Sequence, residues 1–506
     1  MVPNLTLYEM LSRAVEQAPN RIAVHFDEEA ISYRDLLNSV NKLGHYLQNK
    51  GVTAGDRVIM VLQNSPAFIY SYFAITGIGA IVVPVNPVWT AEEISFIIEN
   101  SQAKAIIGVP SPAVKAVADK VDLVLWAGGA EGANWQEAWA NAGTSPLPGP
   151  ASENDLGVFI YTSGTTGKPK GAMLSHRNLT ADVFATVEAL KARHGGEVFL
   201  CVLPLFHCLA ATVCMLMPIG LCAEIVLMEQ FVPKLVVDNL RRHKVSVIVG
   251  VPAMYVVMTT SNMPSDAFSN ARICISGGAP LPISILQRFE QTYGLPIREG
   301  YGLSEASPVV TINVPEKIKP GTIGPPIPGV SVRVIDPSGK DLAQGEAGEL
   351  LVKGPNVMVG YFGMPEATTA ALRDGWLYTG DIATIDEDGY VTIVDRLKDM
   401  IIVGGLKVYP REVEEVLYTH PKIKEAAVVG IKHALRGESV KAVVSLKDGQ
   451  TMTPQDVISF CKEHLANYKV PKVVEFQEAL PKSSTGKILR RLLVTPASAT
   501  AEIAEA

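Results

Sequence analysis

Residues 161–171 read Tyr-Thr-Ser-Gly-Thr-Thr-Gly-Lys-Pro-Lys-Gly, and this stretch decides how the rest of the chain is interpreted. It follows an apolar run, residues 156–160, typical of a buried strand, and it precedes Ser175, a good N-cap for a helix. A strand, then a loop of Gly, Ser, Thr and Lys, then a helix is a pattern that predicts a phosphate-binding site. Glycine lets the backbone come close to a phosphate, while hydroxyl, N–H and ammonium groups donate hydrogen bonds to its oxygens. Only two residues separate Gly164 from Gly167, which excludes a Walker A loop. An exposed glycine-rich turn is the alternative.

The bulk composition favours a large enzyme of more than one domain. The chain has 506 residues, which is too many for one hydrophobic core, and 48% of them are hydrophobic. A net charge of −7 argues against nucleic acid as a partner, since phosphate neutralisation needs a basic face. The six cysteines lack the spacing of a disulfide framework or a zinc site. We therefore expect reduced thiols and cytoplasmic localisation.

No targeting or membrane-spanning segment is predicted. The first residues show neither the basic nor the apolar region of a secretory signal. Residues 208–228 are apolar and long, but Pro218 and Gly220 interrupt them and Glu224 adds a charge, so a buried helix followed by a buried strand is favoured. Peripheral membrane contact remains compatible with an apolar substrate.

The order of patterns predicts an α/β fold. Residues 1–126 alternate helical stripes with apolar runs at 58–62, 81–85, 105–109 and 121–126, which indicates a parallel-rich sheet covered by helices. Residues 127–154 are expected to form an exposed connection, and further strands are expected at 198–203, 245–251 and 272–276. Residues 321–395 have the short alternating runs of a small antiparallel, barrel-like sub-domain.

A charged joint, Asp-Arg-Leu-Lys-Asp at residues 395–399, precedes a small α+β pattern. Strands are expected there at 400–403, 426–431 and 441–446, with helices from Pro410 and at 454–464. We expect an N-terminal domain at 1–396 and a mobile C-terminal lid domain at 397–506.

Five further stretches carry groups suited to a ligand. They are Pro-Leu-Phe-His at 204–207, Ser-Gly-Gly-Ala-Pro at 276–280, Gly-Tyr-Gly-Leu-Ser-Glu at 300–305, Tyr-Thr-Gly-Asp at 378–381 and Pro-Lys-Ser-Ser-Thr-Gly-Lys at 481–487. Each alone has a structural alternative, such as a core histidine or a surface turn. Their combination and order are more specific than any single stretch.

In this order the motifs resemble the adenylate-forming superfamily, which includes acyl-CoA synthetases, peptide-synthetase adenylation domains and beetle luciferases. The resemblance runs from about residue 7 to residue 491. It implies an ATP-dependent ligase that converts a carboxylic acid to acyl-AMP and pyrophosphate and then transfers the acyl group to coenzyme A, with ATP and CoA as co-substrates and Mg²⁺ as cofactor.

The resemblance also implies site residues. ATP or AMP would be bound by Thr162, Ser163, Gly164, Thr165, Thr166, Gly167, Lys168, Lys170, Gly278, Ala279, Pro280, Glu299, Gly300, Tyr301, Gly302, Ser304, Asp381, Ile393 and Arg396. Catalytic roles would fall to Lys487, Glu305 and His207, and metal binding to Thr165 and Glu305. Lys398 would be the hinge, and Gly404, Gly405, Leu406 and Lys407 would serve the CoA step.

The expected acyl pocket consists of His207, Cys208, Val251, Tyr255, Gly277, Gly302 and Ala306. The stretches expected to line it, residues 207–212, 250–255 and 306–310, are apolar apart from His207 and a few hydroxyls and contain no arginine, which disfavours a dicarboxylate such as malonate. Residues 274–282 and 299–310 look most like those of fatty-acyl-CoA ligases, and this resemblance implies a medium- or long-chain fatty acid. An aryl-acid CoA ligase and an acyl-AMP ligase that loads a separate carrier protein are the alternatives. We expect a monomer or homodimer with small-molecule substrates as partners.

Overall fold

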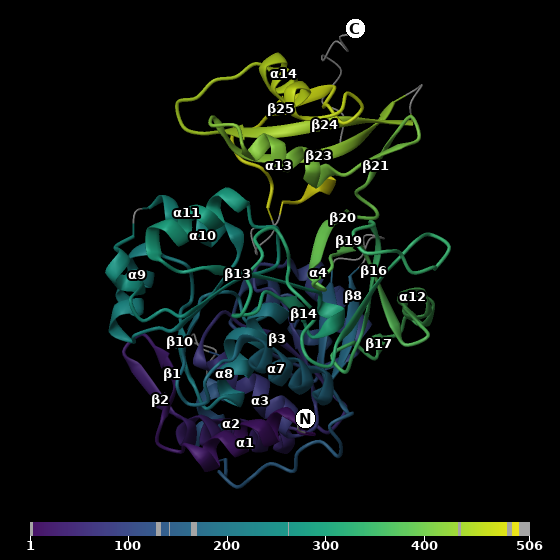
Figure 1. Cartoon of the computed structure of the whole chain (residues 1–506). Coiled ribbons are helices and arrows are strands. Elements are labelled where there is room, and N and C mark those ends of the chain that lie inside the picture. Colours follow the sequence, from purple (N-terminus) through teal and green to yellow (C-terminus); the bar gives the residue numbers. More distant parts are fainter. Residues whose placement is uncertain are drawn as a thin grey trace.

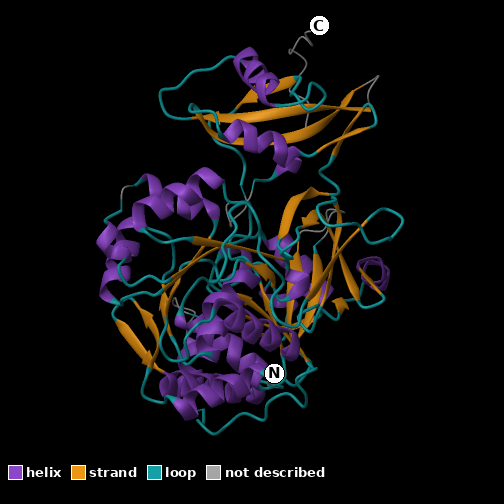
Figure 2. Cartoon of the chain, in the orientation of Figure 1, coloured by secondary structure: helices purple, strands orange, loops and turns teal. Residues whose placement is uncertain are grey.

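The structure is a computed structural model that describes residues 4–127, 133–140, 142–162, 169–261, 263–433, 437–482 and 488–494. A large body of sheets and helices carries a smaller body, which begins with strand β21 (Ile401–Val403), at its upper edge (Figure 1). Helices lie around the strands of the large body and also accompany those of the small one (Figure 2). This arrangement confirms the predicted α/β fold.

One sheet of the large body has seven strands in the order β17-β8-β7-β4-β3-β5-β6. They are β17 (Gly360–Tyr361), β8 (Lys170–Ser175), β7 (Leu156–Thr162), β4 (Ile81–Pro84), β3 (Arg57–Val61), β5 (Ala103–Gly108) and β6 (Leu123–Trp126). Strands β3 to β7 pair in parallel, whereas β8 and β17 add antiparallel strands at one edge. All four residues of β4 are buried, as expected for a parallel strand covered on both faces. The predicted parallel-rich sheet is confirmed.

A second sheet has eight strands in the order β14-β13-β12-β11-β9-β10-β1-β2. They are β14 (Val309–Ile312), β13 (Ile297–Gly302), β12 (Ile273–Ser276), β11 (Val247–Gly250), β9 (Val198–Cys201), β10 (Glu224–Leu227), β1 (Ile22–Phe26) and β2 (Glu29–Ser32). Strand β1 pairs in parallel with β10, with Val24 opposite Ile225. The sequence analysis did not predict β1 and β2, which are short and only partly buried.

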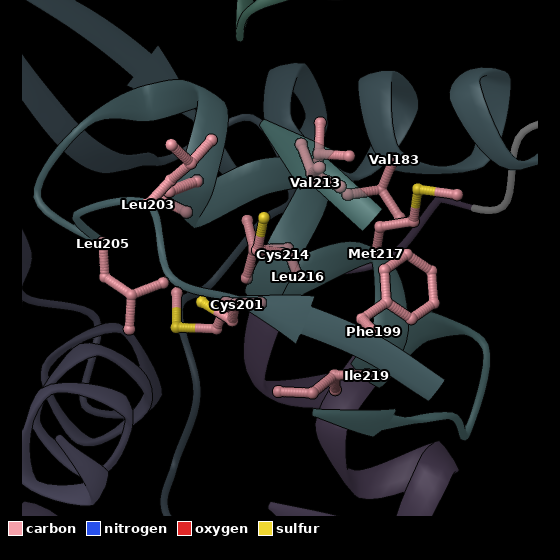
Figure 3. Packing of buried hydrophobic residues seen from close by; sticks show 14 of the residues in the cluster. Val183, Phe199, Cys201, Leu203, Leu205, Val213, Cys214, Leu216, Met217 and Ile219 are labelled. Atoms are coloured by element: carbon pink, nitrogen blue, oxygen red, sulfur yellow. The ribbon is translucent and has the colours of Figure 1, made fainter. Parts of the chain in front are cut away.

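The large body has a main hydrophobic core and a second, smaller one, both built by helices between and around the two sheets. The main ones are α1 (Leu7–Gln17), α2 (Tyr33–Asn49), α3 (Pro66–Gly77), α4 (Ala91–Ser101), α7 (His176–Leu190), α9 (Pro233–Arg242), α10 (Pro252–Thr260) and α11 (Ile283–Tyr293). Nine of the twelve residues of α3 are buried, because it is apolar all round and packs on helices and on β4. Val183 of α7 packs beside Phe199 of β9 and Val213 in the same core (Figure 3).

Residues 208–228 form a buried helical segment and a strand, as predicted. A π-helix at Ala210–Leu216 continues into α8 (Met217–Gly220), and β10 follows after a turn. No helix in the described part of the chain is long and apolar enough to cross a membrane.

Two predictions about the region around the opening stretch need correction. Strand β8, rather than the helix, follows residues 163–169, so β7 and β8 form an antiparallel pair and α7 begins only after Ser175. The connection at 127–154 is not wholly exposed: it contains α6 (Ala133–Ala140), and Leu147 is 5% exposed. Leu147 fills the space that the missing side chains of Gly44 and Gly77 leave on α2 and α3.

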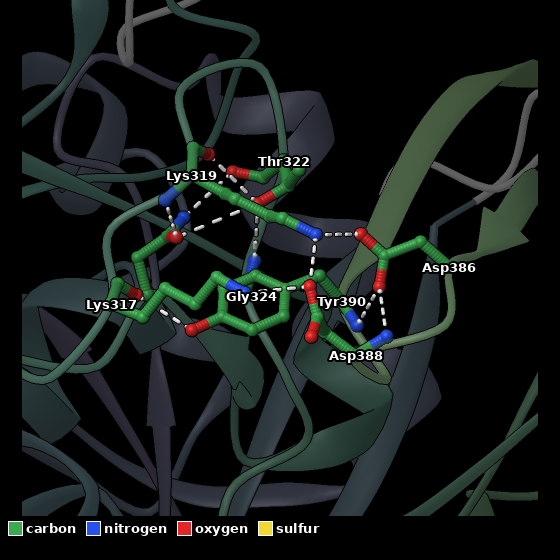
Figure 4. Close-up of polar contacts among 8 residues, drawn as sticks. Lys317, Lys319, Thr322, Gly324, Asp386, Asp388 and Tyr390 are labelled. Carbon is green, nitrogen blue, oxygen red and sulfur yellow. Dashed lines mark hydrogen bonds and ion pairs between the residues drawn. The ribbon is translucent and has the colours of Figure 1, made fainter.

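The predicted barrel-like sub-domain is a curled antiparallel sheet. Its strands are β15 (Ser331–Ile335), β16 (Gly348–Lys353), β18 (Leu372–Arg373), β19 (Trp376–Ile385) and β20 (Val391–Arg396). Lys319 binds both Asp386 and Asp388 of the β19–β20 turn at 2.5 and 2.6 Å, and Lys317 binds Asp388 at 2.7 Å. These ion pairs fasten the segment after β14 to that turn (Figure 4).

The small C-terminal domain follows the predicted pattern closely. It contains β21, β22 (Leu406–Val408), α13 (Pro410–Tyr418), β23 (Ile423–His433), β24 (Gly437–Leu446), α14 (Pro454–His464) and β25 (Val473–Phe476). Thr453 caps α14 through a capping box with Asp456, which explains why the sequence signal was clear. Val413, Val428 and Val457 belong to a core separate from that of the large body.

Candidate active site

Three predicted nucleotide-binding residues are in direct contact at the end of strand β13. The Tyr301 hydroxyl donates a hydrogen bond of 2.5 Å to Asp381 Oδ2, and Arg396 Nε lies 3.1 Å from Asp381 Oδ1. Asp381 and Arg396 face each other in register across β19 and β20. Burial and then the Asp381 carboxylate raise the pKa of Tyr301, which keeps its hydroxyl a donor. An aromatic face beside a carboxylate and a guanidinium suits a base and its ribose hydroxyls.

The loop after β12 is held by a buried carboxylate. Glu299 Oε1 accepts a hydrogen bond of 3.1 Å from the backbone N–H of Leu281. Burial raises the pKa of Glu299 to about 7, although the Leu281 bond and the Arg411 charge act in the opposite direction. Gly278, in the same loop, has φ +82°, which favours glycine. Gly278 and Pro280 are exposed, so Glu299 positions backbone that a planar ring can approach.

Two glycines let β13 approach its neighbours closely. A Cβ atom at Gly300 would come within 3.3 Å of the carbonyl oxygen of Thr311. A Cβ atom at Gly302 would overlap the backbone carbonyl of Pro308. Gly302 therefore requires glycine for packing, whereas a larger residue at Gly300 would need its neighbours to shift by a few tenths of an ångström.

The segment after β9 meets the loop that carries Ser304. Cys208 Sγ lies 3.3 Å from Ser304 Oγ. Burial lowers the pKa of His207 to about 4 and raises the pKa of Cys208 to about 11. At neutral pH both side chains are uncharged, so this wall of the site can contact an apolar ligand without the cost of desolvating a charge.

Glu305, the predicted metal ligand, has a partner that the sequence analysis missed. The Tyr361 hydroxyl donates a hydrogen bond of 2.8 Å to Glu305 Oε1. Lys170 Nζ lies 5.3 Å from the centroid of the Tyr361 ring. Tyr361 could have been noticed in the sequence as part of the Gly-Tyr pair at 360–361. This pair belongs to no helical or strand-like hydrophobic pattern, and it combines a glycine with a ring that carries a hydroxyl.

Two of the predicted acyl-pocket residues, Val251 and Gly277, directly follow the carboxyl ends of β11 and β12. Tyr255 is fully buried and its hydroxyl donates 2.8 Å to the carbonyl of Ile275, so it supports the wall rather than presenting a polar group. A Cβ atom at Gly277 would lie 3.4 Å from Leu209, and one at Gly278 would lie 3.7 Å from Val251. Ala306 is fully buried. Ligands of open α/β sheets commonly bind at this end of the strands.

Seven predicted site residues lie outside the described residues: Ser163, Gly164, Thr165, Thr166, Gly167, Lys168 and Lys487. Thr162, the last residue of β7, and Lys170, the first residue of β8, both belong to the opening stretch and pair in register. The structure therefore places Thr162 and Lys170 side by side on neighbouring antiparallel strands.

The joint around Lys398 is crossed by charged contacts. Asp395 Oδ2 accepts 2.8 Å from the backbone N–H of Arg411, and Arg490 Nη2 lies 2.6 Å from Glu414 Oε2. Arg490 Nη1 also lies 3.3 Å from Asp399 Oδ2 and 3.9 Å from Asp395 Oδ1. These partners were not predicted, because the joint was identified from its charge alone.

The residues predicted for the CoA step form an exposed hairpin in the small domain. Gly404 and Gly405 turn between β21 and β22 with φ of +59° and +84°, and Leu406 is 51% exposed. Among the described residues, no hydrogen bond or ion pair joins this hairpin, Lys407 included, to the group around Tyr301. The structure thus does not bring these two predicted sets together.

Glu305 is compatible with a magnesium ion bound together with phosphate. The described residues contain no group of three or more His, Cys, Asp or Glu side chains that could hold a metal alone. Mg²⁺ commonly uses one or two carboxylates plus substrate phosphates, so one carboxylate is a suitable donor set.

Comparison with protein families gives matches over most of the chain. Residues 11–362 match the AMP-binding enzyme family, and residues 412–487 match the AMP-binding enzyme C-terminal domain. The chain belongs to the AMP-binding enzyme family.

Relatives of this AMP-binding enzyme include ligases for different acids. It is 37% identical to a long-chain-fatty-acid–CoA ligase of Bacillus subtilis, over 97% of this chain and 95% of the relative. It is 38% identical to a feruloyl-CoA synthase of an Amycolatopsis species, over 94% of this chain and 96% of the relative.

Among solved structures, the AMP-binding enzyme resembles ATP-bound MatB from Rhodopseudomonas palustris, with 33% identity, a TM-score of 0.92 and coverage of 97% and 98% of the two chains. The TM-score to the apo form of MatB, over the same shares of the two chains, is 0.80. Since the two forms are one protein, the difference reflects conformation. The overall arrangement here is nearer to the ATP-bound form.

Proposed function

We propose that this AMP-binding enzyme is a fatty-acid–CoA ligase that works through an acyl-adenylate. Adenylate-forming acyl- or aryl-CoA ligase activity is supported by the family and by relatives of nearly full length. The observation that carries the nucleotide half is the contact group of Tyr301, Asp381 and Arg396. The uncharged wall formed by His207 and Cys208 supports an apolar acyl group.

In the proposed first step, the substrate carboxylate attacks the α-phosphate of ATP and pyrophosphate leaves. Tyr301 stacks on adenine, and Asp381 and Arg396 hold the ribose. Gly278, Ala279 and Pro280 flank the base, and Lys170 contacts the phosphates together with residues 163–168. Glu305 would hold Mg²⁺ together with the phosphates, and the ion would supply positive charge to offset the negative charge that develops on the oxygens.

Lys487 is proposed as the catalytic lysine that bridges the carboxylate and the α-phosphate. No protein nucleophile is required, because acyl-AMP is itself an activated acyl donor. In the second step the CoA thiol attacks the adenylate carbonyl and AMP leaves. His207, whose pKa burial lowers to about 4, is proposed to lie beside the acyl group.

We propose that the two steps use two orientations of the small domain about Lys398. The proposed domains are residues 1–396 and 397–506, which is supported by separate hydrophobic cores on either side of the joint. Rotation would remove Lys487 and bring the hairpin of Gly404, Gly405, Leu406 and Lys407 to the site. The higher similarity to ATP-bound than to apo MatB supports an adenylation-like orientation here.

An aryl acid is the second candidate substrate, favoured by the similarity to the feruloyl-CoA synthase. A panel of fatty acids from C6 to C18, with benzoate, coumarate and ferulate, decides between them by pyrophosphate release in the presence of ATP, Mg²⁺ and CoA. We expect the highest kcat/KM for a fatty acid. Turnover of aryl acids alone would overturn the fatty-acid assignment.

CoA consumption, measured in the same panel as loss of free thiol, tests the acceptor. We expect one thiol consumed for each pyrophosphate released. Pyrophosphate release without thiol loss would instead favour an acyl-AMP ligase that loads a carrier protein.

A further inference from the structure

The loop that carries Glu305 is fastened from one side by residues 355–361, which we call the brace. Asn356 Nδ2 donates to the carbonyls of Ala306 and Val309 at 3.0 and 2.8 Å. The Ser307 hydroxyl donates 2.7 Å to the carbonyl of Asn356. The N–H of Met358 donates 2.8 Å to the backbone carbonyl of Glu305 itself. The brace therefore fixes the main chain of Glu305 independently of its carboxylate.

Tyr361, at the end of the brace, reaches the carboxylate. Its hydroxyl donates 2.8 Å to Glu305 Oε1. Its own main chain is held on both sides, because it pairs with Ala172 of β8 and its N–H donates 2.9 Å to Thr368 Oγ1. The phenol is thus a donor on a rigid support. It occupies one carboxylate oxygen and limits the rotation of the group.

The ring of Tyr361 also contacts the end of the opening stretch. Lys170 Nζ lies 5.3 Å from the ring centroid, a cation–π distance. Lys170 begins β8 and is the register partner of Thr162, so it marks where residues 163–169 rejoin the sheet. One side chain therefore touches both a proposed phosphate lysine and the proposed metal carboxylate.

We propose that Tyr361 is a positioning residue for the ATP half-reaction, in which its hydroxyl orients the Glu305 carboxylate and its ring holds Lys170 toward the same phosphates. This inference rests on the proposed role of Glu305. The benefit is preorganisation. A carboxylate and an ammonium group that are already oriented toward the phosphates lose less conformational entropy when MgATP binds. If Tyr361 had only a structural role, its replacement would change the stability of the protein without changing the Mg²⁺ concentration needed for nucleotide binding.

The test uses Tyr361→Phe, which removes only the hydroxyl. Mg²⁺ is titrated against the full-length enzyme in the presence of a non-hydrolysable ATP analogue, and the rise in Tm reports metal-dependent binding without turnover. We expect half-saturation to need about 10-fold more Mg²⁺, the usual scale for losing a partner of a metal ligand. Thioester formation from preformed acyl-AMP should be unchanged. An unchanged Mg²⁺ titration would overturn the proposal.

Tyr390→Phe is the matched control. The Tyr390 hydroxyl donates 2.6 Å to the carbonyl of Lys317, so this variant also loses one partly buried hydrogen bond, at the β19–β20 turn, where it has no contact with Glu305. It should change the ligand-free Tm by an amount similar to Tyr361→Phe and leave the Mg²⁺ titration at the wild-type value. A shift equal to that of Tyr361→Phe would make the effect a general loss of stability and overturn the proposal.

The double variant Glu305→Gln/Tyr361→Phe distinguishes two failures: that Tyr361 does not position Glu305, and that Glu305 does not bind Mg²⁺. Glu305→Gln alone should weaken the Mg²⁺ dependence, and adding Tyr361→Phe should then have no further effect on it. Additive effects would overturn the inference, since the hydroxyl would then act elsewhere. If Glu305→Gln leaves the Mg²⁺ titration unchanged while Tyr361→Phe shifts it, the proposed role of Glu305 fails and with it the route assigned to Tyr361.

Tyr361→Leu tests the ring. It should raise the KM for ATP several-fold above that of Tyr361→Phe, because Lys170 loses its aromatic support. In a Lys170→Met background the two Tyr361 variants should have equal KM values for ATP. A persisting difference would contradict the contact with Lys170.

Discussion

The guanidinium of Arg411, on helix α13 of the small domain, donates a hydrogen bond of 2.7 Å to the carbonyl oxygen of Ile393 on strand β20. The backbone N–H of the same residue donates 2.8 Å to Asp395 Oδ2. The first turn of α13 therefore packs against β20, the last strand of the curled antiparallel sheet. Any rotation of the small domain about Lys398 must break these bonds.

We predict that Arg411→Ala weakens this docking. Loss of the hydrogen bond should slow acyl-AMP formation about 10-fold, a scale set by the roughly 1.5 kcal/mol of one good hydrogen bond. Thioester formation from preformed acyl-AMP should be unaffected or faster. Fluorescence transfer between dyes on the two domains would report the changed orientation.

Arg241→Ala is the control for this prediction, because Arg241 is an exposed arginine on α9 that pairs with Asp266. It should leave both half-reactions and the transfer signal unchanged. Equal slowing of both half-reactions by Arg411→Ala would contradict a role in domain orientation.

Glu299 should make the stability of the large domain depend on pH. Its pKa in the folded protein is about 7, above the ordinary value of 4.5, because the buried site favours the protonated carboxyl. Its contribution to the free energy of unfolding is therefore fully present below pH 4.5 and is lost as the pH rises through 7. Glu299→Gln cannot ionise, so its Tm relative to wild type should increase between pH 5 and pH 8. Differential scanning calorimetry at both values checks this. The exposed Glu290→Gln should show no such trend, and a flat difference for Glu299→Gln would refute the burial argument.

Asp381→Asn should weaken nucleotide binding. The amide keeps the shape and can still accept from Tyr301, but it loses the charge that pairs with Arg396. We expect the Kd for AMP to rise about 10- to 100-fold, since hydrogen bonds between charged groups contribute roughly 1.5–3 kcal/mol. Calorimetric titration with AMP measures it. Asp386→Asn, which loses an ion pair on the surface, should bind AMP normally, and similar losses in both variants would exclude a site-specific role for Asp381.

The motifs predicted that Tyr301, Asp381 and Arg396 serve one site, and these three residues are in contact, whereas partners such as Tyr361 could not be predicted. Glu305 and Tyr361 are 56 residues apart and meet because β17 pairs with β8, a long-range pairing that no local period signals. The roles implied for the site residues remain predictions, and residues 163–168 and Lys487 also lie outside the described part of the chain.

The fold was predictable wherever a local signal was complete. Helix α13 has proline at its first position, and α14 has a full capping box, so both were located at their true starts. Strand β8 was missed because only six residues follow the loop before the helix, and one of them is glycine. Helix α6 was missed because its surroundings are rich in Gly, Ala and Pro, and the packing of Leu147 depends on distant helices.

Leu147 provides a packing test of the connection between the two sets of strands. Leu147→Ala should lower the free energy of unfolding by about 2–5 kcal/mol, as for other buried leucines. Gly44→Ala should also destabilise, because the new methyl group would overlap Leu147. The double variant should be more stable than the sum of the two losses predicts. Strict additivity, measured by denaturant unfolding monitored through tryptophan fluorescence, would show that the two positions do not touch.

The pairing of Val24 with Ile225 has a consequence for how the protein is made. About 200 residues must leave the ribosome after β1 before its partner strand exists, which takes ~10–40 s at ~5–20 residues per second. During that interval β1 and β2 can pair only with each other, as a hairpin without its sheet. The second sheet thus closes late in synthesis, and the first strands of the nascent chain are the ones that chaperones have most time to bind.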